Sequence, residues 1–155
     1  MEQAPEATSS DSLLTRATRS AGSLMDSGLQ YLGIRYRFGG NSAETGFDCS
    51  GLVRHVFMEA LGLNLPRTAR EMSQVGERVQ PSELKPGDLV FFNTMRKTFS
   101  HVGIYVGNDQ FLHSPSAGGK VRVESMSQDY WRKRFNGARR LVDQSDTAEM
   151  ETKLR

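Results

Sequence analysis

The stretch that decides the fold is residues 48–62, which read DCSGLVRHVFMEALG. Apolar side chains recur there with the period of an α-helix that buries one side. The buried stripe is expected to contain Leu52, Val53, Val56, Phe57, Ala60 and Leu61. The pattern therefore predicts a helix that begins near Asp48-Cys49 and ends at Gly62, a residue type typical of helix ends.

Cys49 is the one cysteine of the chain, and it lies at the start of this predicted helix. Free backbone N–H groups and the helix dipole stabilise an anion there, which predicts a lowered thiol pKa. The rotation of 100° per residue places Cys49 near the centre of the apolar stripe, so its partner is expected on a sheet. His55 points roughly 120° away and lies about 9 Å further along the helix, so we interpret it as a solvated surface residue.

The second half of the chain predicts a series of strands. LVFF at residues 89–92 is a continuous apolar run, typical of a strand buried on both faces. Further strands are predicted at 101–106, 111–113, 121–123 and about 137–142, with a short helix around Tyr130 and Trp131. Because the helices come first and the strands follow, the sequence predicts an α+β fold with helices packed at one face of an antiparallel sheet.

The arms at 101–106 and 111–113 are predicted to form a hairpin around the turn residues 107–109. A three-residue turn pairs Val106 with Gln110 and Gly103 with His113. In this register His101 and His113 share one face as diagonal neighbours about 7–8 Å apart. One imidazole is then close enough to orient the other.

The remaining elements are shorter. Leu24 to Leu32 has a helical apolar pattern, with Gly33 suited to the position after the helix. Thr68 is predicted to cap a short helix through about Val75, with Glu71 as its capping-box partner. Residues 36–46 combine aromatic and turn residues and are predicted to be a loop.

A chain of 155 residues suits a single domain. Residues 1–20 are polar and are predicted to be a mobile tail, followed by one domain over 21–143 and a second tail over 144–155. The domain is expected to be a monomer.

Composition excludes several classes of protein. A net charge of +2 gives no argument for a nucleic-acid partner. One cysteine excludes an intrachain disulfide, a four-cysteine zinc site and a CxxC pair. No apolar run has the length of a membrane span, and the start of the chain lacks the features of a signal peptide.

Cys49, His101 and His113 suit nucleophilic catalysis, which needs a thiol, a base and a polar group that orients the base. Two alternatives remain open: a cysteine that is merely a small buried residue, and a catalytic zinc held by one cysteine and two histidines. Against zinc, no carboxylate that could support either histidine is apparent in the neighbouring sequence.

Five segments, in order and spacing, resemble the NlpC family of bacterial cell-wall cysteine peptidases. They are YRFGG at 36–40, FDCSGL at 47–52, LPRT at 65–68, PGDLVFF at 86–92 and SHVGIYVG at 100–107. The resemblance extends over about residues 24–142, and the small exported murein endopeptidases of the Spr type are the most similar.

This resemblance implies a papain-like fold and hydrolysis of amide bonds in peptidoglycan stem peptides, typically between D-γ-glutamyl and a diamino acid. It implies Cys49 as nucleophile, His101 as base and His113 as the third polar residue, with no cofactor or metal. Tyr36 matches the tyrosine near the oxyanion. Positions lining the groove match Asp48, Ser50, Arg67 and Ser100. A member of this family is expected in the cell envelope, as a periplasmic protein or an outer-membrane lipoprotein whose signal is absent from this chain.

Other functions share the same features. One is a catalytically quiet peptidoglycan-binding or adaptor protein, and another is a thiol amidase toxin or acyltransferase on the same scaffold. Arg132-Lys133-Arg134 with Arg139-Arg140 is interpreted as a solvated basic face, with contact to anionic wall polymers or a partner as the alternative.

Overall fold

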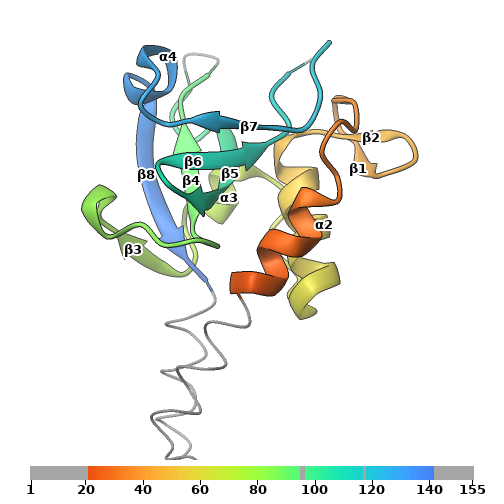
Figure 1. The fold of residues 1–155 in the computed structure, drawn as a ribbon, viewed down its shortest axis with the longest axis horizontal. Helices are drawn as coiled ribbons and strands as arrows, with labels where there is room; N and C mark the ends of the chain where they lie inside the picture. The colour runs from red at the N-terminus through yellow and green to blue at the C-terminus, as the bar shows by residue number, and fades with distance from the viewer. Residues whose placement is uncertain (1–20, 95–96, 117, 142–155) are drawn as a thin grey trace, which may run out of the picture.

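The computed structural model describes residues 21–94, 97–116 and 118–141, so both predicted tails lie outside it. A helix over 21–29 comes first. The elements that follow are β1 (Asn41–Ser42), β2 (Gly46–Phe47), α2 (Cys49–Leu61), α3 (Ala69–Met72), β3 (Glu77–Val79), η1 (Pro81–Glu83), β4 (Leu89–Phe92), β5 (His101–Gly107), β6 (Gln110–His113), β7 (Arg122–Ser125), α4 (Asp129–Arg132) and β8 (Phe135–Arg140). Six strands form one antiparallel sheet in the order β3-β8-β4-β5-β6-β7 (Figure 1).

Helix α2 has the predicted position and both of its ends are stabilised. The Asp48 carboxylate accepts a hydrogen bond from the Gly51 backbone N–H at 2.7 Å, and Gly62 ends the helix with a left-handed φ of 69°. The predicted stripe is buried at Leu52, Val53, Val56 and Phe57, while Ala60 and Leu61 are half-buried. This packing fixes where the helix starts, and therefore where Cys49 lies.

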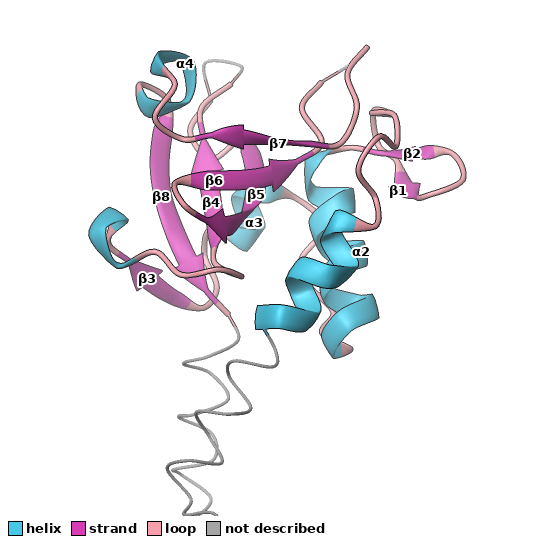
Figure 2. Cartoon of the chain, in the orientation of Figure 1, coloured by secondary structure: helices cyan, strands magenta, loops and turns pink. Residues whose placement is uncertain are grey.

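The sheet is buried on two faces that carry different side chains. Leu89 and Phe91 of β4 join the cluster that packs against α2 and helix 21–29, whereas Val90 and Phe92 join a second cluster on the opposite face. Figure 2 shows helix 21–29 and α2 together at one side of the sheet. Trp131 of α4 belongs to the second cluster. The predicted strand buried on both faces is confirmed.

The β5–β6 hairpin has a tighter turn than predicted. Gly107, not Val106, pairs with Gln110, and the two-residue turn Asn108-Asp109 has left-handed φ angles of 53° and 62°. A register shift between Tyr105 and Gly107 compensates for the shorter turn. As a result, Ile104 pairs with Leu112, as the predicted register requires.

Other differences lie in short elements. The predicted loop over 36–46 contains β1 and the start of β2, and neither β3 nor η1 was predicted. The first helix ends at residue 29, and the N–H of Gly33 donates to Val121 O at 2.9 Å, so Gly33 does not directly follow that helix. Helix α3 has the predicted Thr68–Glu71 capping box but ends at Met72, where the next residue, Ser73, donates back to Arg70 O at 2.6 Å.

None of the helices within the described ranges has the length and apolar content needed to span a bilayer.

Candidate active site

A cavity of about 410 Å³ brings together four of the predicted site residues. Tyr36, Cys49, Ser100 and His101 line it, although they come from a loop, the start of α2 and the start of β5. Glu124 and Trp131 line the same cavity from β7 and α4. The cavity therefore lies where the helix start meets one end of the central strands.

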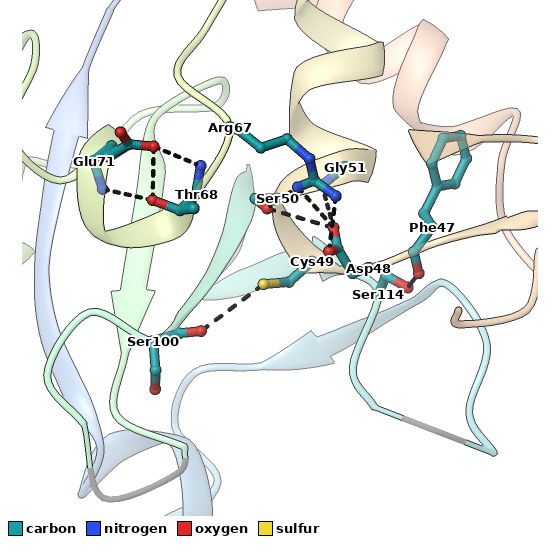
Figure 3. A network of polar contacts seen from close by, with 10 residues as sticks. All are labelled: Phe47, Asp48, Cys49, Ser50, Gly51, Arg67, Thr68, Glu71, Ser100 and Ser114. Carbon is teal, nitrogen blue, oxygen red and sulfur yellow. Dashed lines mark hydrogen bonds and ion pairs between the residues drawn. The ribbon is translucent and has the colours of Figure 1, made fainter. Parts of the chain in front are cut away.

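Cys49 is the first residue of α2 and is half-buried. Its Sγ lies 3.9 Å from the carbonyl oxygen of Ser100 (Figure 3). Burial raises the pKa of the Cys49 thiol to about 11, and the Asp48 carboxylate acts in the same direction, against the lowering effect of backbone groups of Val102 and Ser50. The predicted lowering of this pKa is therefore wrong, because desolvation outweighs the helix N-terminus.

His101 and His113 lie on one face of the hairpin, as predicted. Nε2 of His101 is 2.8 Å from Nδ1 of His113, and both side chains are buried. The Trp131 ring stacks on His101 with centroids 5.5 Å apart. Burial, followed by the neighbouring His113, lowers the pKa of His101 to about 3, and burial also lowers the pKa of His113. Both imidazoles are thus neutral at pH 7.

Glu124 is the site residue that sequence reasoning missed. Its Oε2 lies 2.8 Å from Nε2 of His113, so a carboxylate supports this histidine although none is apparent in the sequence next to either histidine. In the sheet register Glu124 pairs with Phe111, two residues before His113. Alternating residues share a face, so the pairing of β6 with β7 was the signal that could have found it.

Asp48, Ser50 and Arg67 brace the start of α2. The Arg67 guanidinium donates to Ser50 Oγ at 2.7 Å and to the two Asp48 carboxylate oxygens at 3.3 and 3.0 Å (Figure 3). None of the three is among the residues lining the cavity that contains Cys49. In this structure they hold the segment that carries Cys49.

Tyr36 and Ser100 line the same cavity as Cys49. Burial raises the pKa of Tyr36, and the adjacent Cys49 and Asp48 add to that rise. The Ser100 hydroxyl accepts a hydrogen bond from the Thr94 N–H at 2.9 Å, and the Ser100 carbonyl oxygen is the group that faces Cys49.

His55 is not the solvated surface residue expected from the sequence. Its Nε2 lies 2.9 Å from the Tyr31 hydroxyl, and its half-buried ring packs against Tyr31 and Phe47. Tyr31 also donates to the Glu59 carboxylate at 2.8 Å. The residue does lie away from the Cys49 cavity, as the helix geometry predicted.

Of the basic residues near the C-terminal end, Arg132 and Lys133 are exposed, as expected of a solvated face, whereas the Arg140 side chain is not. Arg140 pairs with the buried Asp88 at 2.8 Å, Arg134 lies over the Tyr130 ring, and Arg132 pairs with Asp129. Within residues 21–94, 97–116 and 118–141, His, Cys, Asp and Glu side chains form no group of three or more suited to a metal ion.

Comparison with known proteins places these features in a family. Residues 33–140 match the model of the NlpC/P60 family. The chain is 41% identical over 145 residues to murein DD-endopeptidase MepH of Escherichia coli K12, covering 92% of this chain and 54% of that protein. It is 45% identical over 122 residues to MepS, named murein DD-endopeptidase and murein LD-carboxypeptidase, of the same strain (79% and 63% covered). It is 47% identical over 113 residues to the γ-DL-glutamyl hydrolase of Bacillus subtilis 168 (72% and 27% covered).

Solved structures agree on the fold. An NlpC/P60 family protein from Bacillus cereus superposes with a TM-score of 0.74 at 31% identity, covering 79% of this chain and 40% of that one. The peptidoglycan hydrolase RipB of Mycobacterium tuberculosis superposes with a TM-score of 0.71 at 30% identity, covering 83% and 67%. The chain thus spans between about a quarter and two thirds of the length of the curated relatives named above.

Proposed function

This chain belongs to the NlpC/P60 family, and we propose that it is a cysteine endopeptidase that cleaves amide bonds in peptidoglycan stem peptides. One observation carries the proposal: the Cys49 thiol at a helix start and the buried His101, which is hydrogen-bonded to His113, line one cavity. In this proposal Cys49 is the nucleophile, His101 is the base and His113 orients the base.

The free nitrogen of His101 identifies the proton acceptor. Nε2 of His101 is hydrogen-bonded to His113, and Nδ1 of His101 makes no hydrogen bond with any described residue. The Cys49 thiol instead faces the Ser100 carbonyl oxygen at 3.9 Å. We infer that Sγ and Nδ1 meet when substrate binds, because catalytic hydrogen bonds often tighten only in the complex.

The reaction then follows from these groups. Nδ1 of His101 takes the thiol proton while Sγ attacks the amide carbonyl carbon, and the carbonyl oxygen becomes an oxyanion. In this proposal the Cys49 backbone N–H and the hydroxyl of Tyr36, which lines the same cavity, donate to that oxyanion. Collapse breaks the C–N bond, and the proton on Nδ1 passes to the leaving amine. Water, deprotonated by His101, releases the acyl group from sulfur and restores the thiol.

We assign the cleaved bond to the D-γ-glutamyl–diamino acid linkage of the stem peptide. The γ-DL-glutamyl hydrolase supports this choice by its name, whereas MepH and MepS are named DD-endopeptidases and favour the cross-link instead. The two bonds give products of different mass. The proposed place of action is the bacterial cell envelope, where the substrate lies.

The experiment that tests the proposal is digestion of purified muropeptides, both monomeric and cross-linked, followed by mass spectrometry. Cleavage after D-glutamate in monomers is the expected result. Separation of cross-linked dimers into intact monomers would move the assignment to the DD cross-link. If correctly folded protein gives no product from either substrate, the chain is not an endopeptidase, and the alternative of a peptidoglycan-binding protein is favoured.

A further inference from the structure

We propose that Glu124 is a positioning residue that fixes the tautomers of His113 and His101, and so keeps Nδ1 of His101 free to accept a proton. The inference deepens the proposed function and rests on it for its catalytic meaning. The test of the inference is independent of the proposed function, because the tautomers are measured in the free protein.

Glu124 is held as a hydrogen-bond acceptor from three sides. Its Oε2 accepts from Arg122 Nε at 2.7 Å and lies 2.8 Å from His113 Nε2, and its Oε1 accepts from Trp131 Nε1 at 3.2 Å. The His113 hydrogen bond, with those of Arg122 and Trp131, lowers the pKa of Glu124 to about 2. An ionised carboxylate has no proton to donate, so His113 Nε2 must be the donor.

Donation by His113 Nε2 sets the direction of the series of hydrogen bonds that joins His101, His113 and Glu124. A neutral imidazole carries a single N–H, so a proton on Nε2 of His113 leaves Nδ1 as an acceptor. The 2.8 Å contact then requires Nε2 of His101 to donate to it. His101 in turn keeps its lone pair on Nδ1, which is the nitrogen that can accept the thiol proton of Cys49.

The opposite direction satisfies the contact between the two histidines equally well. In that arrangement Nδ1 of His113 donates to Nε2 of His101, and His101 carries its proton on Nδ1. Such a histidine cannot accept a proton from Cys49. The structure therefore assigns to Glu124 the choice between a competent and an incompetent pair.

Two substitutions separate the acceptor from the charge. Glu124→Leu removes both and leaves His113 Nε2 without its partner. Glu124→Gln keeps one acceptor oxygen, and the donors Arg122 and His113 around the Oε2 position favour placing that oxygen there, with the amide nitrogen toward Trp131. Glu124→Gln is therefore expected to keep the tautomers, while it loses the charge and the hydrogen bond from Trp131 Nε1.

The test measures the ¹⁵N shifts of the histidine rings by NMR in the free protein, together with kcat and KM on muropeptides. In the wild type, both histidines should carry their proton on Nε2. Glu124→Leu should move both protons to Nδ1 and lower kcat at least about 100-fold, because the base is lost, with KM little changed. Glu124→Gln should keep the wild-type tautomers with a smaller loss of kcat.

Glu59→Leu is the matched control, because Glu59 also accepts hydrogen bonds, from Ser27 and Tyr31, outside the cavity. This substitution should lower the melting temperature without changing the tautomers of His101 and His113 or the value of kcat. Nδ1–H on His113 in the wild type, or unchanged tautomers in Glu124→Leu, would overturn the inference. A rise in KM with kcat unchanged would also overturn it, since Glu124 would then be a substrate contact.

If Glu124→Leu does not fold, the wild-type and Glu124→Gln tautomers decide the question. If the wild type hydrolyses no muropeptide, the proposed function fails while the tautomers still decide whether Glu124 positions the histidines.

Discussion

The protonation state of Cys49 and His101 determines when the site becomes reactive. Burial raises the pKa of the thiol to about 11 and lowers the pKa of His101 to about 3, so a neutral thiol and a neutral imidazole coexist at pH 7. Proton transfer is then coupled to attack on the substrate carbonyl, with no ion pair formed beforehand. A neutral thiol is also less prone to oxidation in the free protein.

Alkylation of Cys49 tests this protonation state. We expect the iodoacetamide reaction to rise only at alkaline pH, with a midpoint above the ordinary value of 9.0, because burial favours the neutral thiol. The measurement is the alkylation rate against pH by mass spectrometry, with protein unfolded in urea as the control. Rapid alkylation of the folded protein at pH 6 would show that a thiolate–imidazolium pair exists in the free protein.

The sequence identifies some site residues better than others. Residue type and position were enough to name Cys49, His101 and His113 as candidates, because a helix start and a hairpin register are local features. Glu124 lies in another strand, and its contact with His113 depends on how β6 pairs with β7. The shift of the thiol pKa was predicted in the wrong direction because segments distant in sequence bury Cys49. The local helix pattern carries no information about that burial.

At the scale of elements, α2 is held against the loop before it by a glycine. A Cβ built on Gly51 would lie 2.0 Å from the carbonyl oxygen of Gly40, which is backbone and cannot rotate away. We expect Gly51→Ala to lower the free energy of unfolding by about 3 kcal/mol and to disturb the position of Cys49. Urea unfolding and muropeptide hydrolysis measure the two effects.

Gly62→Ala is the matched control for this substitution. Its Cβ meets nothing within 4 Å, but its φ of 69° is strained for alanine, so a loss of only about 1 kcal/mol is expected. Equal losses for the two variants would show that the Gly40 contact does not constrain the helix.

His55 connects α2 to the segment that follows helix 21–29, and its removal should affect stability more than catalysis. It contacts Tyr31, which lies just beyond helix 21–29 and is joined to Glu59 of α2. We expect His55→Ala to lower the free energy of unfolding by about 1 kcal/mol, through the lost hydrogen bond and ring contacts, and to leave kcat unchanged. A large fall in kcat without a change in stability would place His55 in the reaction.

Long, periodic elements were predictable and short ones were not. Helix α2 and strand β4 match their predictions because burial fixes their pattern over several residues. The two-residue strands β1 and β2 carry no periodicity, and β3 forms an edge whose pairing with β8 involves residues more than 50 positions away. The bulge before Gly107 preserved the alignment of the histidines although the turn was predicted one residue too long.

Over the whole molecule, the buried titratable groups make the fold sensitive to acid. His101 has a pKa of about 3 in the folded state against 6.5 when unperturbed, and Glu124 has about 2 against 4.5. Because the unfolded chain binds these protons first, the free energy of unfolding falls as pH drops from about 6.5 toward 3. Cys49 has the corresponding effect at alkaline pH, where the free energy of unfolding falls as pH rises from 9 toward 11.

Urea unfolding at pH 7 and at pH 4 measures this effect. We expect lower stability at pH 4, because the unfolded chain takes up protons there that the buried groups of the folded protein do not. Equal stability of the wild type at both values would contradict the assignment of buried neutral histidines.

The most direct test of the central claim compares muropeptide hydrolysis by the wild type, Cys49→Ala and His101→Ala at equal concentration, with circular dichroism to verify the fold. Removal of the nucleophile or the base is expected to lower the rate by a factor of about 10³ or more in each variant, while the spectra stay unchanged. Hydrolysis by folded Cys49→Ala at a rate near that of the wild type would contradict the claim that Cys49 is the nucleophile of a peptidase.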